Sequence, residues 1–167
     1  TPEEGMSACF EFTHLYLENQ GFTAYETSNF AKFSFESQHN SSYWKQESYL
    51  GIGPAAHSFN QLTRQWNISN NATYVKQITL GNIPAEIEEL SPENQINEYI
   101  MTQLRTNWGI DLSYLRERFS FISVPFPEDE IASWVTDGYA EIADNRLKLV
   151  GKGKLIADGL SAEIFVL

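Results

Sequence analysis

Cysteine is nearly absent from this 167-residue chain, which contains only Cys9. One thiol cannot form a disulfide within the chain, and it cannot hold a metal cluster whose ligands are all cysteines. Chains without disulfides are typical of reducing compartments, so we expect a cytoplasmic location.

Basic side chains are also scarce, with 11 Lys and Arg against 22 Asp and Glu and a net charge of −11. Residues 1–90 hold ten acids and four bases (net −6), and residues 91–167 hold twelve acids and seven bases (net −5). The acidic excess is therefore spread along the chain. A surface of this sign repels phosphate backbones, which disfavours nucleic acid as a partner.

Long apolar runs are the third absence. No run reaches the roughly 18 apolar residues typical of a transmembrane helix, so we expect no membrane span. No basic segment followed by an apolar one resembles a signal peptide. The chain begins with Thr1 and not Met, which favours a processed protein or a piece of a longer one. Its 42% hydrophobic content is typical of one or two folded domains.

The first part of the chain predicts a helix followed by short strands. Thr1 is placed to cap the helix, Pro2 takes its first position, and Gly21 ends it. Apolar residues lie on more than one side of this helix, so we expect burial on more than one side. Residues 22–27 and 50–53 read as two strands, an order typical of α/β proteins. Two strands cannot bury their own faces, so a parallel sheet would be largely missing here.

The second part predicts a mainly helical domain. A short helix over 72–80 precedes residues 82–90, which we interpret as a linker and domain boundary. Three helices follow, the first two capped by Ser91 and Asp111 and the third opened by Pro127; a hairpin at Asp144-Asn145 and a trailing helix complete the order of a winged-helix domain. The third helix begins with Glu128-Asp129-Glu130 and has no basic residue, so a structural or interaction module is favoured over a DNA reader.

Residues 25–59 are neither helix-periodic nor cleanly alternating, and they combine aromatic, polar and glycine residues. Such a mixture suits a ligand-facing loop. Within it, the imidazole of His39 is a candidate ligand for haem iron, and Tyr43 and Trp44 offer flat faces to a macrocycle. The alternative is that His39 caps a turn and Trp44 fills the edge of a core.

The glycine-rich segment 51–58 has two interpretations as well. Gly51 and Gly53 could let the backbone approach a ligand closely, with His57 beside it, or they could form a tight strand end. The segment lacks the full dinucleotide-binding fingerprint. We expect Glu26 on the surface, because burial of its charge would be costly without a partner. No nucleophile, base and orienting acid assemble into a catalytic set.

Together these segments resemble the radical SAM proteins similar to oxygen-independent coproporphyrinogen III oxidase, in particular the haem-chaperone branch. The resemblance rests on three signatures that occur in the same order as in that family: residues 25–32, 39–44 and 49–58. It continues through Arg64, Asn67 and Tyr74 and recurs weakly over residues 146–151.

The resemblance implies an α+β fold. Residues 1–90 would be the last elements of a partial TIM-type barrel with a linker, and residues 91–167 a winged-helix-like domain. The family binds a [4Fe–4S] cluster and S-adenosylmethionine through a Cys-x-x-x-Cys-x-x-Cys loop. That loop is not in this sequence. We therefore expect a C-terminal fragment without catalytic activity of its own.

The resemblance also implies site residues and a function. His39 would contact haem iron, with Asn40, Tyr43 and Trp44 around it. Gly51, Gly53 and His57 would lie near S-adenosylmethionine or the substrate. The parent would carry haem and deliver it to acceptor proteins. The alternatives are that the parent is a coproporphyrinogen III oxidase, or that residues 91–167 mainly bind a partner protein.

Overall fold

The computed structural model describes residues 2–167. The chain forms two compact units, one made of residues 1–45 with 96–167 and the other of residues 46–95. We describe each unit by itself. The assignment of residues 1–90 to a barrel and of 91–167 to a separate winged-helix-like domain stays a prediction.

The first unit begins with the expected helix, α1 (Pro2–Asn19), which gives way to Gly21 at φ +77°. The predicted cap, Thr1, lies outside the described residues. The expected strand over 22–27 shrinks to β1 (Thr23–Ala24), which pairs antiparallel with β2 (Phe30–Ala31). Every strand pair among the described residues is antiparallel.

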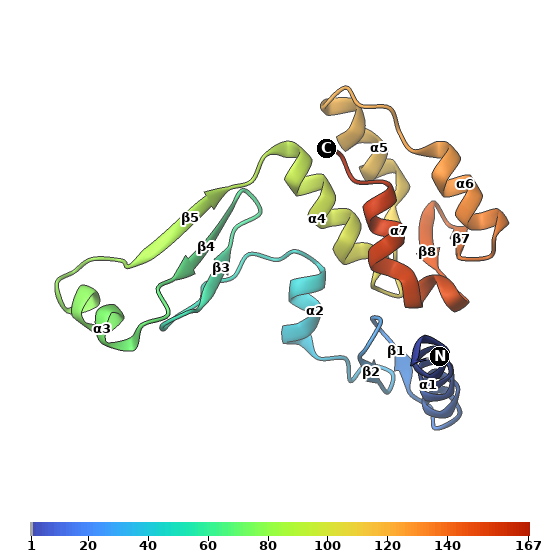
Figure 1. The fold of residues 1–167 in the computed structure, drawn as a ribbon, viewed down its shortest axis with the longest axis horizontal. Coiled ribbons are helices and arrows are strands. Elements are labelled where there is room, and N and C mark those ends of the chain that lie inside the picture. Colours follow the sequence, from blue (N-terminus) through green and yellow to red (C-terminus); the bar gives the residue numbers. More distant parts are fainter. Residues whose placement is uncertain (1) are drawn as a thin grey trace. The chain divides into compact units, whose positions relative to one another are not determined.

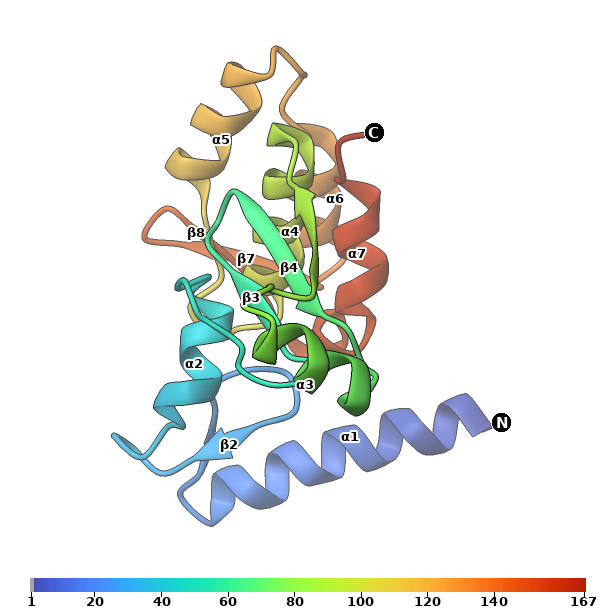
Figure 2. The ribbon, with the colours of Figure 1, turned by 90° about the vertical axis from the view of Figure 1, so that its left-hand side faces the viewer.

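Helix α1 is buried on one side only, which corrects the expectation of burial on several sides. Phe10, His14 and Leu17 are half-buried, whereas Phe12 is 68% and Leu15 63% exposed. The cause is that the described residues offer partners to one side of this helix. Figure 2 shows α1 from the side, with strand β2 beyond its C-terminal end.

The second half of the first unit folds around one apolar core (Figure 1). Its helices and strands follow the predicted order, with a 3₁₀ turn before the last helix. They are α4 (Pro92–Leu104), β6 (Ile110–Asp111), α5 (Leu112–Phe121), α6 (Glu128–Thr136), β7 (Ala140–Ala143), β8 (Arg146–Leu149), η1 (Gly151–Ile156) and α7 (Ala157–Glu163). The sheet order is β6-β8-β7.

The core of this half matches the predicted helical periodicity. Ile100 of α4, Leu115 of α5 and Leu147 of β8 are completely buried. The hairpin prediction is confirmed, with Asp144 at φ +50° and Asn145 at φ +60°, the left-handed values that two-residue hairpin turns require.

The other unit is a three-stranded antiparallel sheet of order β3-β4-β5 with one helix. Its elements are β3 (His57–Phe59), β4 (Thr63–Asn67), α3 (Asn71–Thr79) and β5 (Ala85–Glu89). The helix confirms the prediction over 72–80. Two predictions are wrong: residues 50–53 form no strand, and residues 85–89 form β5 where we expected a linker. Backbone pairing with β4 makes these acidic residues a strand, because it satisfies their polar groups whatever the side chains are.

Candidate functional site

Residues 38–44 form a short helix, α2 (Gln38–Trp44), that the sequence did not predict. Ser37 caps it, because its Oγ accepts a hydrogen bond from the backbone N–H of Asn40 at 3.2 Å. Helical geometry brings side chains four residues apart onto one face. The predicted site residues 39–44 therefore divide between an outer and an inner side of this helix.

His39 and Tyr43 lie together on the exposed side of α2. Their rings meet edge to face with centroids 4.9 Å apart, and the Tyr43 hydroxyl lies 3.2 Å from His39 Nε2. Just before the helix, Phe33 is 89% and Phe35 81% exposed. An exposed imidazole has the nitrogen donor that haem iron binds, and exposed aromatic rings offer apolar surface to a porphyrin.

Asn40 lies on the inner side, where its Nδ2 donates to the Tyr25 hydroxyl at 3.1 Å. Tyr25 is buried, and so is its neighbour Glu26, which is 3% exposed. The expected surface position of Glu26 is therefore wrong. Its carboxylate accepts hydrogen bonds from the Ser28 backbone N–H and from Asn29 Nδ2, and these bonds offset the cost of burial.

Trp44 attaches the end of α2 to the last turn of α4 and to the residue that follows it. Its backbone carbonyl accepts a hydrogen bond from Gln103 Nε2 at 2.6 Å. The guanidinium carbon of Arg105 lies 5.7 Å from the centre of the Trp44 rings, within the range of a cation–π contact. The indole Nε1 is buried, and no hydrogen-bond partner for it lies among the described residues.

Hydrogen bonds hold residues 105–107, which follow α4, against residues 25–27. The Asn107 N–H donates to the Tyr25 carbonyl at 3.1 Å, and the Thr27 hydroxyl donates to the Arg105 carbonyl at 3.1 Å. Sequence reasoning missed Gln103 and Arg105, because they lie about 60 residues further along the chain than the helix they contact, and no local pattern marks them.

Gly51 and Gly53 lie in the other compact unit, in a loop whose polar groups are bonded internally. Asn67 Nδ2 donates to the carbonyls of Gly51 and Gly53 at 3.3 and 2.9 Å. A Cβ on Gly51 would lie 2.1 Å from the carbonyl oxygen of His57. At Gly51 the lack of a Cβ therefore allows close packing against the backbone of His57. A place for exposed His57 near S-adenosylmethionine or the substrate stays a prediction.

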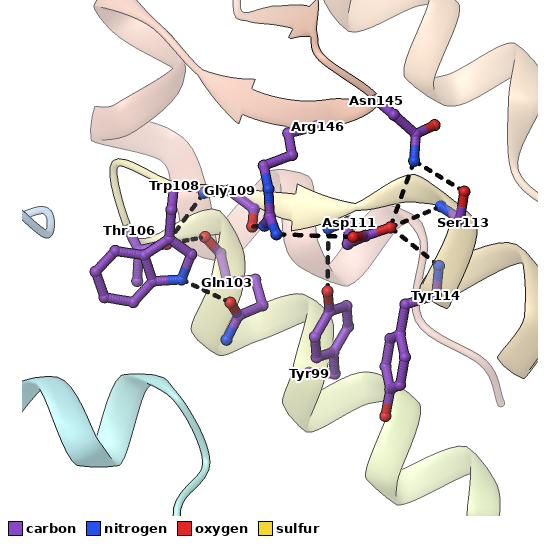
Figure 3. A network of polar contacts seen from close by, with 10 residues as sticks. All are labelled: Tyr99, Gln103, Thr106, Trp108, Gly109, Asp111, Ser113, Tyr114, Asn145 and Arg146. Atoms are coloured by element: carbon purple, nitrogen blue, oxygen red, sulfur yellow. Dashed lines mark hydrogen bonds and ion pairs between the residues drawn. The ribbon is translucent and has the colours of Figure 1, made fainter.

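Figure 3 shows the polar contacts around Asp111, which pairs with Arg146 beside the turn of the β7–β8 hairpin. Asp111 caps α5 by accepting from the N–H groups of Ser113 and Tyr114, and its other carboxylate oxygen lies 3.7 Å from Arg146. The Tyr99 hydroxyl accepts from the Asp111 N–H at 3.0 Å, and burial raises the pKa of that hydroxyl. Arg146 therefore holds the hairpin to α5, and its contacts are structural.

Among the side chains of residues 5–167, no three of His, Cys, Asp or Glu gather as a metal site. No described helix is long and apolar enough to cross a membrane. Cys9 is exposed and is the chain's one cysteine, so this chain does not fit a [4Fe–4S] cluster. A porphyrin iron, which one protein histidine can hold, would fit His39.

Known proteins match this chain over most of its length. A family model described as the HemN C-terminal domain matches residues 90–156. The heme chaperone HemW of Mycobacterium tuberculosis strain H37Rv is 30% identical over 156 residues, 90% of this chain and 37% of that protein. The chain is HemN/HemW-like and matches the C-terminal part of this radical SAM group.

Two further comparisons agree with that relation. The heme chaperone HemW of Bacillus subtilis strain 168 is 29% identical over 159 residues, 94% of this chain and 42% of that protein. The solved structure of coproporphyrinogen III oxidase (HemN) from Escherichia coli, a radical SAM enzyme, matches 91% of this chain with a TM-score of 0.64 and 16% identity. This likeness shows a mixed α and β fold similar to that of HemN. The HemN/HemW-like chain spans about two fifths of the length of these relatives, from 37% to 42%.

Proposed function

We propose that this chain is part of a haem chaperone and that α2 is its haem contact. His39 is the residue that would hold the iron, and the exposed rings beside it would cover part of the macrocycle. The observation that carries the proposal is the exposed His39–Tyr43 pair on a helix that is fixed at its other side. The HemW relatives support the choice of haem as the ligand.

The contact with Tyr43 constrains the ring of His39. A histidine that binds a metal through one ring nitrogen is usually oriented by a neighbour that contacts the other. His39 Nε2 lies 3.2 Å from the Tyr43 hydroxyl, and either group can donate in this contact. Tyr43 would therefore orient the imidazole that holds the iron.

The remaining cofactors belong to the whole protein in this proposal. A [4Fe–4S] cluster needs several thiolates, and Cys9 supplies one, so the cluster and S-adenosylmethionine are assigned outside the residues described. Delivery of haem to acceptor proteins would then be the cellular role, and cytoplasm its expected place. Residues 91–167 support α2 through Gln103 and Arg105. Deletion of residues 91–167 would therefore disturb the haem contact as well as any partner surface.

Haem titration of the full-length protein tests the assignment. Replacing His39 by Ala should weaken haem binding at least about tenfold, which corresponds to about 1.4 kcal/mol, and should shift the Soret band. Gln38→Ala is the matched control, because Gln38 is exposed on the same helix. Equal affinity and an identical Soret band in the His39→Ala protein would show that another residue holds the iron.

A further inference from the structure

The buried amide of Gln103 occupies the junction between α2 and the C-terminal core. Gln103 is 6% exposed, and both ends of its amide are used. Its Nε2 donates to the Trp44 carbonyl at 2.6 Å, and its Oε1 accepts from the Trp108 indole N–H at 2.8 Å. Figure 3 shows the amide of Gln103 with the Trp108 indole directed at its oxygen.

The amide matches these two neighbours in one orientation only. A carbonyl accepts and an indole N–H donates, so the side chain between them must donate to the first and accept from the second. A glutamine supplies both functions, whereas a carboxylate or an apolar side chain of similar length does not. Leaving a buried donor or acceptor without a partner costs about 1–3 kcal/mol.

Few other described contacts fix α2. The helix has seven residues and its Ser37 cap is exposed, so its own hydrogen bonds hold it weakly. Its inner side is bonded through Asn40 to Tyr25, and its end through Trp44 to Gln103. Tyr25 is in turn bonded to Asn107, four residues after Gln103. Both attachments therefore lead to residues 103–107.

We infer that Gln103 is the positioning residue of the haem contact: it holds the Trp44 end of α2 so that His39 is presented in one orientation. Gln103 does not touch the ligand in this scheme, and it acts through Trp44. The inference rests on the proposed haem function. If α2 is docked in only a fraction of the molecules, the apparent haem affinity falls to that fraction of its full value.

Two substitutions separate the bond to Trp44 from the bond to Trp108. Gln103→Met removes both bonds, and Gln103→Glu at pH 8 keeps an acceptor for Trp108 but sets an oxygen against the Trp44 carbonyl. Gln95→Met is the matched control, because Gln95 lies on the same helix and also donates to a backbone carbonyl, that of Leu90 at 3.0 Å. The bonds described for Gln95 go to Leu90 and Ser91 and not to α2.

Hydrogen exchange and haem titration of the full-length variants are the two readouts. Both Gln103 variants should lose amide protection at Ser41 and Lys45, keep it in α5, bind haem about fivefold or more weakly, and alter the Soret band. Loss of haem affinity in Gln103→Met alone, or unchanged protection at Ser41 and Lys45 in both variants, would overturn the inference. Unchanged haem binding in His39→Ala would instead reject the proposed function, and the exchange data would still decide whether Gln103 docks α2.

Discussion

Gly109 is the position where one added methyl group should do the most damage to the turn that supports α2. Its φ is +65°, a left-handed value that costs a residue with a side chain about 1–2 kcal/mol. A Cβ at this position would also lie 2.2 Å from the carbonyl oxygen of Leu147, a backbone atom of β8 that cannot move by itself. Forced overpacking of this kind costs about 1–3 kcal/mol more.

Gly138 provides the matched comparison for Gly109→Ala. Its φ is +74°, but nothing lies within 4 Å of the position that a Cβ would take. Gly138→Ala should therefore cost only the backbone term of about 1–2 kcal/mol. Urea denaturation of the full-length protein, followed by hydrogen exchange in α5 and β8, measures both. Equal losses for the two variants would refute the idea that close packing against Leu147 makes Gly109 necessary.

Three further perturbations have defined outcomes. Tyr43→Phe removes the hydroxyl beside His39 Nε2, so haem affinity should fall by up to about fivefold, the value of a hydrogen bond of about 1 kcal/mol, and titration checks it. Glu26→Ala leaves the Ser28 N–H and the Asn29 amide without their acceptor, so urea denaturation should show a loss of about 1–3 kcal/mol, whereas no loss would contradict the contacts described. Burial and the charge of Lys154 lower the pKa of His14 below 6.5, so its contribution to stability is present above pH 6.5 and is lost as the pH falls through the folded pKa. An NMR titration of His14 should give a midpoint below 6.5, and a midpoint above it would contradict this environment.

The sequence predicted those elements whose signals are local. Proline and acidic residues at helix starts, with apolar residues at helical spacing, identified α1, α4, α5 and α6, and Asp144-Asn145 identified the hairpin. In contrast, α2 has seven mostly polar residues and depends on bonds to Tyr25 and Gln103, which are distant in sequence. Strand β5 was missed for a similar reason, because its acidic residues are ordered by pairing with β4.

The candidate site was predicted in composition but not in geometry. The resemblance identified His39 and Tyr43, and the structure adds that they meet on one face of a helix. It also adds the support from Gln103 and Arg105, which no pattern near residues 39–44 indicated. The burial of Glu26 was not foreseen either, since its two donors are arranged by the turn that it stabilises.

Chemical rescue of the iron ligand tests the central claim most directly. His39→Gly in the full-length protein removes the imidazole and leaves space for a free one beside Tyr43. We predict that this variant loses the haem spectrum of the wild-type protein and that added imidazole restores the Soret band. A His39→Gly protein whose haem spectrum equals that of the wild type without imidazole would contradict the claim that His39 holds the iron.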